Sequence, residues 1–304
     1  MNTKIGSLLS AISLLLSSQV FAAAYSVPPT NEALIGHLQF TTTNTNENVI
    51  AIAKRYNLGY NSIASANPHL EMSRSFPAGA FLQVPTQHLL PNLPRKGFII
   101  NLPEMRMYYF PLGSNQVLTF PIGIGKIGKT IPITLTSVAR KAKNPIWIPP
   151  QDIREFNLKQ GIVLPRIMPA GPDNPLGPYA IYTRIPTYLM HSTPYTESIG
   201  KRASFGCIRM YETDIQELFP SVTNGIPIAI INTPIKIGWQ DDRLYIEAHE
   251  PLEEHNPEAA SLANMVHLLS DTAVSHDTLV DWQMLTYLAK DKDGVPHEVG
   301  MKLR

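Results

Sequence analysis

The chain has very little cysteine: Cys207 is the single cysteine among 304 residues. One cysteine cannot form an internal disulfide, so the fold has to be held by a packed core. The thiol lies in the stretch SFGCIRM, Ser204 to Met210, between a glycine and an Ile-Arg pair. A lone cysteine is either a small buried hydrophobe or a reactive nucleophile. Both interpretations stay open until a base for the thiol is found.

The chain also lacks an excess of charge of either sign. It has 25 Lys and Arg against 24 Asp and Glu, which gives a net charge of +1. Nucleic-acid binding depends on basic side chains that neutralise phosphates, so we expect no nucleic-acid partner. A hydrophobic content of 44% with 16% charged residues excludes a disordered chain. The 27 prolines favour turns and short strands over a helical bundle.

Long apolar runs are missing except at the N-terminus. There, Lys4 precedes an apolar run that ends at about Phe21, and three alanines follow. This order is typical of a secretory signal, although the run approaches the ~20 residues of a membrane anchor. Its serines and the alanine cluster favour cleavage. We therefore expect residues 1–23 to be a signal peptide and the mature protein to be exported without a membrane span.

Motifs for metals and nucleotides are either absent or in the wrong context. The histidines form no H-E-x-x-H pair and no zinc spacing, and the acids of Glu247–His255 favour a solvated surface. GIGKIGKT, Gly123 to Thr130, matches a phosphate loop, but a proline and β-branched residues follow it instead of a helix. SIGK, Ser198 to Lys201, matches S-x-x-K without its S-D-N and K-T-G companions. We expect no metal, no nucleotide and no organic cofactor.

Residues 34–86 form a separate unit of predicted secondary structure. A strand-like run stands at each end, and helical faces are indicated around Val49–Ala53 and Ile63–Ala66. This strand–helix–helix–strand order resembles the LysM module, which binds peptidoglycan, through IAKRYN, ANP and PAGAFLQVP. Asn44–Asn46 replaces the usual Gly-Asp turn before the first helix. A spacer that only packs is the alternative.

Two further regions follow a proline-containing linker, Leu90–Gly97. Residues 96–233 are rich in short β-type runs, including a hairpin of GFIINL and MRMYYF, with one helix at Glu212–Val222. Residues 251–304 are expected to be a helical C-terminal extension, with a helix from Pro257 to about Leu269 and another from Asp277. The fold class is therefore α+β, mainly β.

A nucleophilic thiol needs a base, because free cysteine has a pKa near ~8.5. His191 lies sixteen positions before Cys207, at the end of the strand-like run Tyr188–Met190. The segment between them is rich in Ser, Thr, Gly and Pro and can loop back. His191 could then accept the thiol proton and later pass it to and from amines. A structural histidine is the alternative.

The neighbours of the cysteine suggest supporting roles. Gly206 has no side chain, so the backbone there can approach a substrate and point the Cys207 amide at an oxyanion. Arg209 either holds a substrate carboxylate or pairs with an acid such as Asp214.

The stretch HSTPYTESIGKRASFGCIRM resembles the signature of the L,D-transpeptidase (YkuD-like) catalytic domain, a histidine followed by S-H-G-C-[IV]-R. Supporting stretches are PIGIGKIGK, ARKAKNPIWIPP and PAGPDNPLGPYAIY. The resemblance implies a β-sandwich-like catalytic domain with Cys207 as nucleophile and His191 as general base. Ser204 and Gly206 would shape the loop, and Arg209 would support substrate or loop geometry. Phe205 stands where the family has a second histidine, which is not its base.

The same resemblance implies a function in the periplasm. The substrates would be tetrapeptide stems of peptidoglycan containing diaminopimelate, from which the enzyme releases D-alanine and forms a thioester. An acceptor amine would then give a 3–3 crosslink or attach a lipoprotein to the wall. Two alternatives remain: an L,D-carboxypeptidase with water as acceptor, and a non-catalytic peptidoglycan-binding protein.

Overall fold

The computed structural model describes residues 23–44, 47–129, 131–273 and 277–303. The predicted signal peptide lies outside these residues except for Ala23, and so do Thr45, Asn46 and Thr130 of the motifs above. Within the described ranges, no helix combines the length and the apolar character needed to cross a bilayer.

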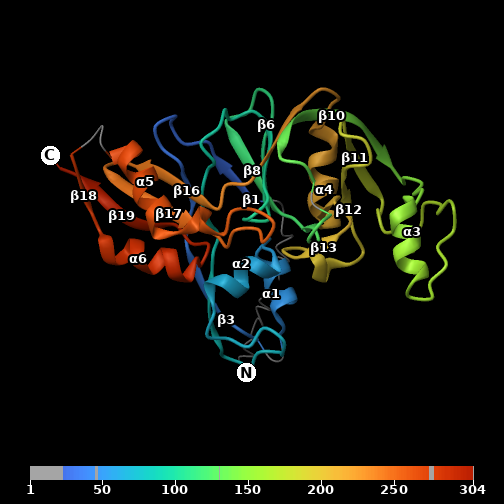
Figure 1. The fold of residues 1–304 in the computed structure, drawn as a ribbon, viewed down its shortest axis with the longest axis horizontal. Helices are drawn as coiled ribbons and strands as arrows, with labels where there is room; N and C mark the ends of the chain where they lie inside the picture. The colour runs from blue at the N-terminus through green and yellow to red at the C-terminus, as the bar shows by residue number, and fades with distance from the viewer. Residues whose placement is uncertain (1–22, 45–46, 130, 274–276, 304) are drawn as a thin grey trace, which may run out of the picture.

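One nine-stranded sheet forms the centre of the molecule, in the order β1-β8-β7-β6-β15-β10-β11-β12-β14 (Figure 1). Its strands are β1 (Ala23–Ser26), β6 (Gly97–Asn101), β7 (Arg106–Phe110), β8 (Gln116–Pro121), β10 (Thr134–Lys143), β11 (Tyr179–Thr183), β12 (Leu189–Ser192), β14 (Ile208–Met210) and β15 (Pro227–Ile231). Strands β6 and β7 form the predicted antiparallel hairpin. A small pair, β9 (Ile124–Gly125) and β13 (Arg202–Ser204), runs beside it.

The mainly β, α+β class is confirmed, but the expected sandwich is instead one curled sheet. Strand β10 joins its two halves: Thr134–Ser137 pair with β15, and the rest of β10 pairs with β11. The register shifts between Val138 and Arg140, and such a bulge bends a strand and increases its twist. Because β10 pairs with a strand of each half, the two halves form one continuous sheet instead of the two separate sheets of a sandwich.

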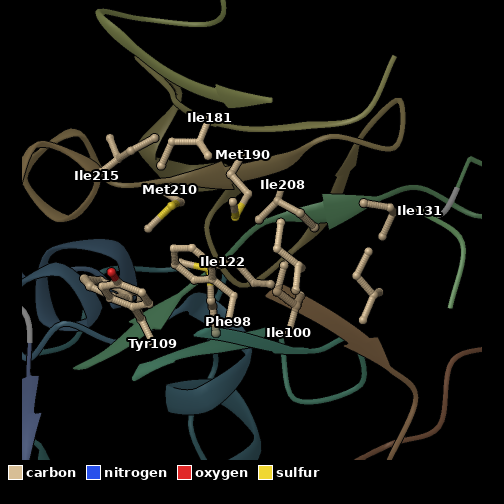
Figure 2. Packing of buried hydrophobic residues seen from close by; sticks show 14 of the residues in the cluster. Phe98, Ile100, Tyr109, Ile122, Ile131, Ile181, Met190, Ile208, Met210 and Ile215 are labelled. Carbon is tan, nitrogen blue, oxygen red and sulfur yellow. The ribbon is translucent and has the colours of Figure 1, made fainter. Parts of the chain in front are cut away.

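The main core fills the inside of this curl. Phe98 and Ile100 of β6 belong to the same buried cluster as Met190 of β12 and Ile208 of β14, at the far end of the sheet. Figure 2 shows these side chains meeting between the two halves. Helix α4 (Glu212–Leu218) adds Ile215 to the cluster, and the 3₁₀ turns η1 (Thr196–Ser198) and η2 (Phe219–Ser221) complete this region.

The N-terminal unit has the predicted strand–helix–helix–strand order. Strand β3 (Gln39–Thr42) pairs with β4 (Phe81–Val84), with α1 (Val49–Arg55) and α2 (Tyr60–Ala66) between them, and β2 (Leu34–Gly36) pairs with β5 (Gln87–Leu89). Asn67 explains the ANP motif. Its Nδ2 donates to Gln83 O at 2.8 Å, and its Oδ1 accepts from Gln83 N at 2.8 Å, which fixes the end of α2 against β4.

The C-terminal region is not purely helical, which corrects the expectation for residues 251–304. A four-stranded sheet, β16-β17-β19-β18, shares a buried core with two helices at the left of Figure 1. Its elements are β16 (Ile235–Gln240), β17 (Arg243–Ala248), η3 (Pro257–Ala260), α5 (Leu262–Ala273), β18 (Thr278–Val280), α6 (Trp282–Asp291) and β19 (His297–Lys302). The helix predicted from Asp277 starts later, because Asp281 caps it by accepting from the amides of Gln283 and Met284.

Candidate active site

Two parallel strands bring the predicted site residues together. In the β12–β14 pair, His191 lies opposite Arg209, and Cys207 directly precedes β14. Because side chains alternate along a strand, Cys207 and Arg209 share a face, and His191 is on the neighbouring strand. The segment after His191 loops back as predicted, and all three side chains line one hollow.

The cysteine loop is fixed by one serine hydroxyl. Ser204 Oγ donates to Cys207 O at 2.6 Å and accepts from Gly206 N at 3.1 Å. Gly206 has φ +110°, and an added Cβ would lie 2.7 Å from the Tyr188 ring and 3.0 Å from Lys129 O. Only glycine fits this position without displacing its neighbours.

The protonation of His191 follows from its surroundings. Its Nδ1 lies 2.6 Å from Ser192 O, and a carbonyl oxygen only accepts, so Nδ1 bears the proton and Nε2 keeps its lone pair. Burial lowers the pKa of His191 to about 4 and the Arg209 charge lowers it further, against the raising effects of the Ser192 and Leu176 backbone groups. The imidazole is therefore a neutral base at physiological pH.

Cys207 is also neutral in the resting site. Burial raises the pKa of its thiol, while the Leu189 amide and the Arg209 charge act in the opposite direction. The Sγ–H group donates to Thr187 O at 3.7 Å. A neutral thiol and a neutral imidazole therefore line the same hollow, and a thiolate there would have to form by transfer of the thiol proton to a base.

Arg209 does not form an ion pair with Asp214, the acid suggested for one of its two predicted roles. Within the described residues it forms no ion pair, and its buried Nε has no hydrogen-bond partner. Its guanidinium lies 5.8 Å from the centre of the Tyr195 ring. Asp214 is buried elsewhere, where burial and the nearby Glu217 raise its pKa to about 8. Burial lowers the pKa of Arg209, and the nearby Cys207, Tyr195 and Glu197 act in the opposite direction, but no described acid forms an ion pair with its guanidinium. The charge therefore stays available to a ligand.

Two hollows meet at the thiol. The first, here called the Arg140 hollow, has a volume of about 560 Å³ and contains Arg140, Tyr182 and Cys207 in its wall. The second, the His191 hollow, has about 290 Å³ and is lined by His191, Arg209 and Cys207. Both hollows share Phe205 and Cys207. A reacting bond at the sulfur could therefore extend one substrate part into each hollow.

Phe205 contacts a helix that the sequence analysis missed, α3 (Gln151–Leu158). The ring packs edge-on against Phe156 of α3, with centroids 5.0 Å apart, and the Lys126 ammonium lies 3.7 Å from one ring centre and 3.6 Å from the other. Lys129 adds an ion pair to Asp152 of α3 at 2.6 Å. Helix α3 buries none of its residues, so it has no apolar core-facing stripe by which it could be predicted.

A second polar cluster is buried far from the thiol in sequence. His88, Glu104 and Glu247 bring three possible metal ligands together. However, the Lys236 ammonium bonds both carboxylates, at 2.9 Å to Glu104 and 2.8 Å to Glu247, and His249 bonds Glu247 at 2.8 Å. Glu104, Glu247 and His249 therefore form an ion network whose cation is the Lys236 ammonium. The expected solvated surface at Glu247–His255 is wrong for Glu247 and His249, which are buried.

Comparison with known proteins identifies the family. Residues 95–237 match the YkuD L,D-transpeptidase catalytic domain. The probable L,D-transpeptidase YcfS of Escherichia coli is 37% identical over 287 residues, covering 91% of this chain and 88% of that protein. The probable L,D-transpeptidase YbiS of Escherichia coli is 34% identical over 305 residues, covering 97% of this chain and 99% of its own length.

Among solved structures, L,D-transpeptidase 3 from Mycobacterium tuberculosis aligns with 69% of this chain and 99% of its own, at 15% identity and a TM-score of 0.34. The identity and coverage of the Escherichia coli relatives decide the assignment. This chain belongs to the L,D-transpeptidase family of cysteine-dependent cell-wall transpeptidases.

Proposed function

We propose that this chain is a peptidoglycan L,D-transpeptidase with Cys207 as the nucleophile and His191 as the general base. The observation that best supports this role is the shared hollow of the two side chains, together with the His191 tautomer. The Nδ1–H bond to Ser192 O leaves the Nε2 lone pair available for a proton. A neutral imidazole and a neutral thiol that line the same hollow have the protonation states that general-base activation requires.

In the acylation step, His191 Nε2 accepts the thiol proton as Cys207 Sγ attacks a carbonyl of the tetrapeptide stem. This carbonyl joins the L-centre of diaminopimelate to the terminal D-alanine. The C–N bond then breaks, and His191 returns the proton to the leaving amine. D-Alanine departs, and the stem stays on Cys207 as a thioester.

In the second step, an acceptor amine attacks the thioester. His191 takes a proton from the amine, an amide forms, and the Cys207 thiol is regenerated. The acceptor would be a stem amine, which gives a 3–3 crosslink, or an amine of a lipoprotein. The chemistry uses only side chains of this chain.

Supporting roles follow from the contacts. The Gly206 amide already donates to Ser204 Oγ, so we assign the oxyanion contact to the amide of Cys207 itself. Ser204 and Gly206 position this loop. Arg209, which forms no ion pair within the described residues, would hold a substrate carboxylate in the His191 hollow.

The other regions would deliver the enzyme to its substrate. We assign residues 1–23 to a signal peptide that directs the protein to the periplasm, and residues 34–86 to a LysM-like peptidoglycan-binding module. Residues 96–233 would form the catalytic domain. Residues 251–304 would be an extension, whose strands β18 and β19 join β16 and β17 in one sheet.

Incubation with disaccharide-tetrapeptides, followed by mass spectrometry, tests the proposal. Crosslinked dimers with released D-alanine are expected. Tripeptides alone would identify an L,D-carboxypeptidase, and unchanged substrate would favour a non-catalytic binding protein.

The matched variant is Cys207→Ala. Because it removes the sulfur alone, we expect no thioester and no carbapenem adduct, with unchanged stability. Wild-type protein should gain the mass of one carbapenem. Turnover by Cys207→Ala would refute the mechanism.

A further inference from the structure

The two hollows at Cys207 each contain one arginine in their lining. Arg209 lines the His191 hollow and Arg140 lines the Arg140 hollow. Among the residues that the structure describes, neither forms an ion pair. Each lies near a tyrosine ring: Arg140 is 3.5 Å from the centre of Tyr182, and Arg209 is 5.8 Å from that of Tyr195. Positive charges so arranged suit anionic groups of a ligand.

The position of Arg140 follows from the bend in β10. It comes directly after the bulge at Val138, and bulges near active sites redirect side chains. Stacking on Tyr182 orients the guanidinium plane while its outer N–H groups stay accessible. The other cation of this hollow, Lys129, is already paired with Asp152 at 2.6 Å. Arg140 therefore supplies the uncompensated positive charge of the Arg140 hollow.

The chemistry decides which substrate part enters each hollow. His191 protonates the leaving amine and deprotonates the incoming amine, so both amines must occupy the side where His191 lies. That side is the His191 hollow, which Arg140 does not line. The acyl part of the stem, which stays bound to sulfur through both steps, then extends into the Arg140 hollow.

We propose that Arg140 is a specificity-determining residue that binds a carboxylate of the acyl donor. This inference rests on the proposed function. Two groups of the stem have the required chemistry: the free carboxylate at the far end of diaminopimelate and the carboxylate of the preceding glutamate. A planar guanidinium fixed on Tyr182 can form two parallel hydrogen bonds to either one. Arg140 would thus select stems whose carboxylate is free over stems in which it is an amide.

The test compares three tetrapeptide stems: one unmodified, one amidated at diaminopimelate and one amidated at glutamate. The acylation rate at Cys207 is measured by mass spectrometry over a range of stem concentrations. Wild-type enzyme should acylate one of the amidated stems roughly ten- to a hundred-fold less efficiently, through a higher KM. The affected stem identifies the carboxylate.

The variant Arg140→Met keeps an unbranched apolar chain over Tyr182 but removes the charge. Its acylation efficiency on the unmodified stem should fall by the same factor, whereas its efficiency on the affected amidated stem should change little. The preference for the unmodified stem should therefore disappear. Arg140→Lys should restore part of the preference, which a purely structural role would not produce. Arg184→Met is the control, because Arg184 is exposed and lines neither hollow.

Two failures are distinguishable. If wild-type enzyme acylates all three stems equally, or if Arg140→Met keeps the wild-type preference, the role of Arg140 is refuted while the transpeptidase stands. If wild-type enzyme acylates none of them, the proposed function itself fails.

Discussion

Two buried polar clusters in this chain differ in how their charges are compensated. In the ion network, the Lys236 ammonium lies within 2.9 Å of Glu104 and 2.8 Å of Glu247. At the candidate active site, Arg209 forms no ion pair among the described residues, and Cys207 and His191 are held neutral by burial. Paired charges stabilise an arrangement of strands, whereas unpaired groups remain available for a substrate. Substitutions at the candidate active site should therefore lower the acylation rate more than the stability, and substitutions in the ion network should lower the stability more than the acylation rate.

The largest effect is expected for His191→Gln. Glutamine can still donate to Ser192 O, so the fold should keep its stability, but it cannot accept the thiol proton. The acylation rate should fall by about 10²- to 10⁴-fold, the usual contribution of a general base. A rate within tenfold of wild type, measured by mass spectrometry, would remove His191 from the mechanism.

The variant Lys236→Met should have the converse result. It leaves two buried carboxylates without their shared cation, which destabilises a protein by about 3–5 kcal/mol. Urea denaturation measures this loss, and the acylation rate per folded molecule should stay within about twofold of wild type. As a control, Lys236→Met combined with Glu104→Gln and Glu247→Gln should recover part of the stability. A single variant as stable as wild type would contradict the role of the network.

The contrast also explains what the sequence could predict. Cys207, Gly206 and Ser204 lie within four positions, so one short stretch contains the whole loop. His191 could be found because parallel pairing of β12 with β14 needs only a short return segment. These cases depend on local chain geometry.

The rest depends on partners distant in sequence. Glu247 belongs to a charged stretch typical of a surface, and its burial follows from Lys236 and from Leu89, whose amide donates to it at 2.6 Å. Helix α3 contacts the loop through Phe156 without contributing to the core. Arg140 is placed by a bulge. No pattern in a single sequence indicates such contacts.

The pH dependence of the unfolding free energy and of the acylation rate also distinguishes the two clusters. Burial lowers the pKa of His191 to about 4, and burial together with Arg106 and Lys236 lowers that of His88. The unfolded chain then binds more protons than the folded chain below pH ~6.5, so both residues reduce stability as the pH falls. For His191 this amounts to on the order of 3 kcal/mol down to pH 4.

Removing either histidine, as His191→Gln or His88→Gln, should flatten the dependence of the unfolding free energy on pH between 6.5 and 4. The wild-type acylation rate should fall as the pH drops through about 4, where His191 gains its proton. His88→Gln should keep this profile. An acylation profile that shifts in His88→Gln would show that the two clusters are coupled.

The smallest effect on stability is expected for the contact between the Lys126 ammonium and two aromatic rings that are not fully buried. The Lys126 ammonium lies 3.6 Å from the Phe156 centroid and 3.7 Å from that of Phe205, and such contacts contribute about 0.5–1 kcal/mol when partly exposed. Lys126→Met keeps the apolar stem, so hydrogen exchange in α3 should accelerate only about two- to fivefold. Phe205→His should accelerate it similarly, since the ring contact with Phe156 is weakened while Cys207 and His191 are untouched. Because the lost contact is not part of proton transfer, the acylation rate should change less than α3 exchange does. A rate loss above tenfold in Phe205→His would instead place this ring among the groups that control the thiol.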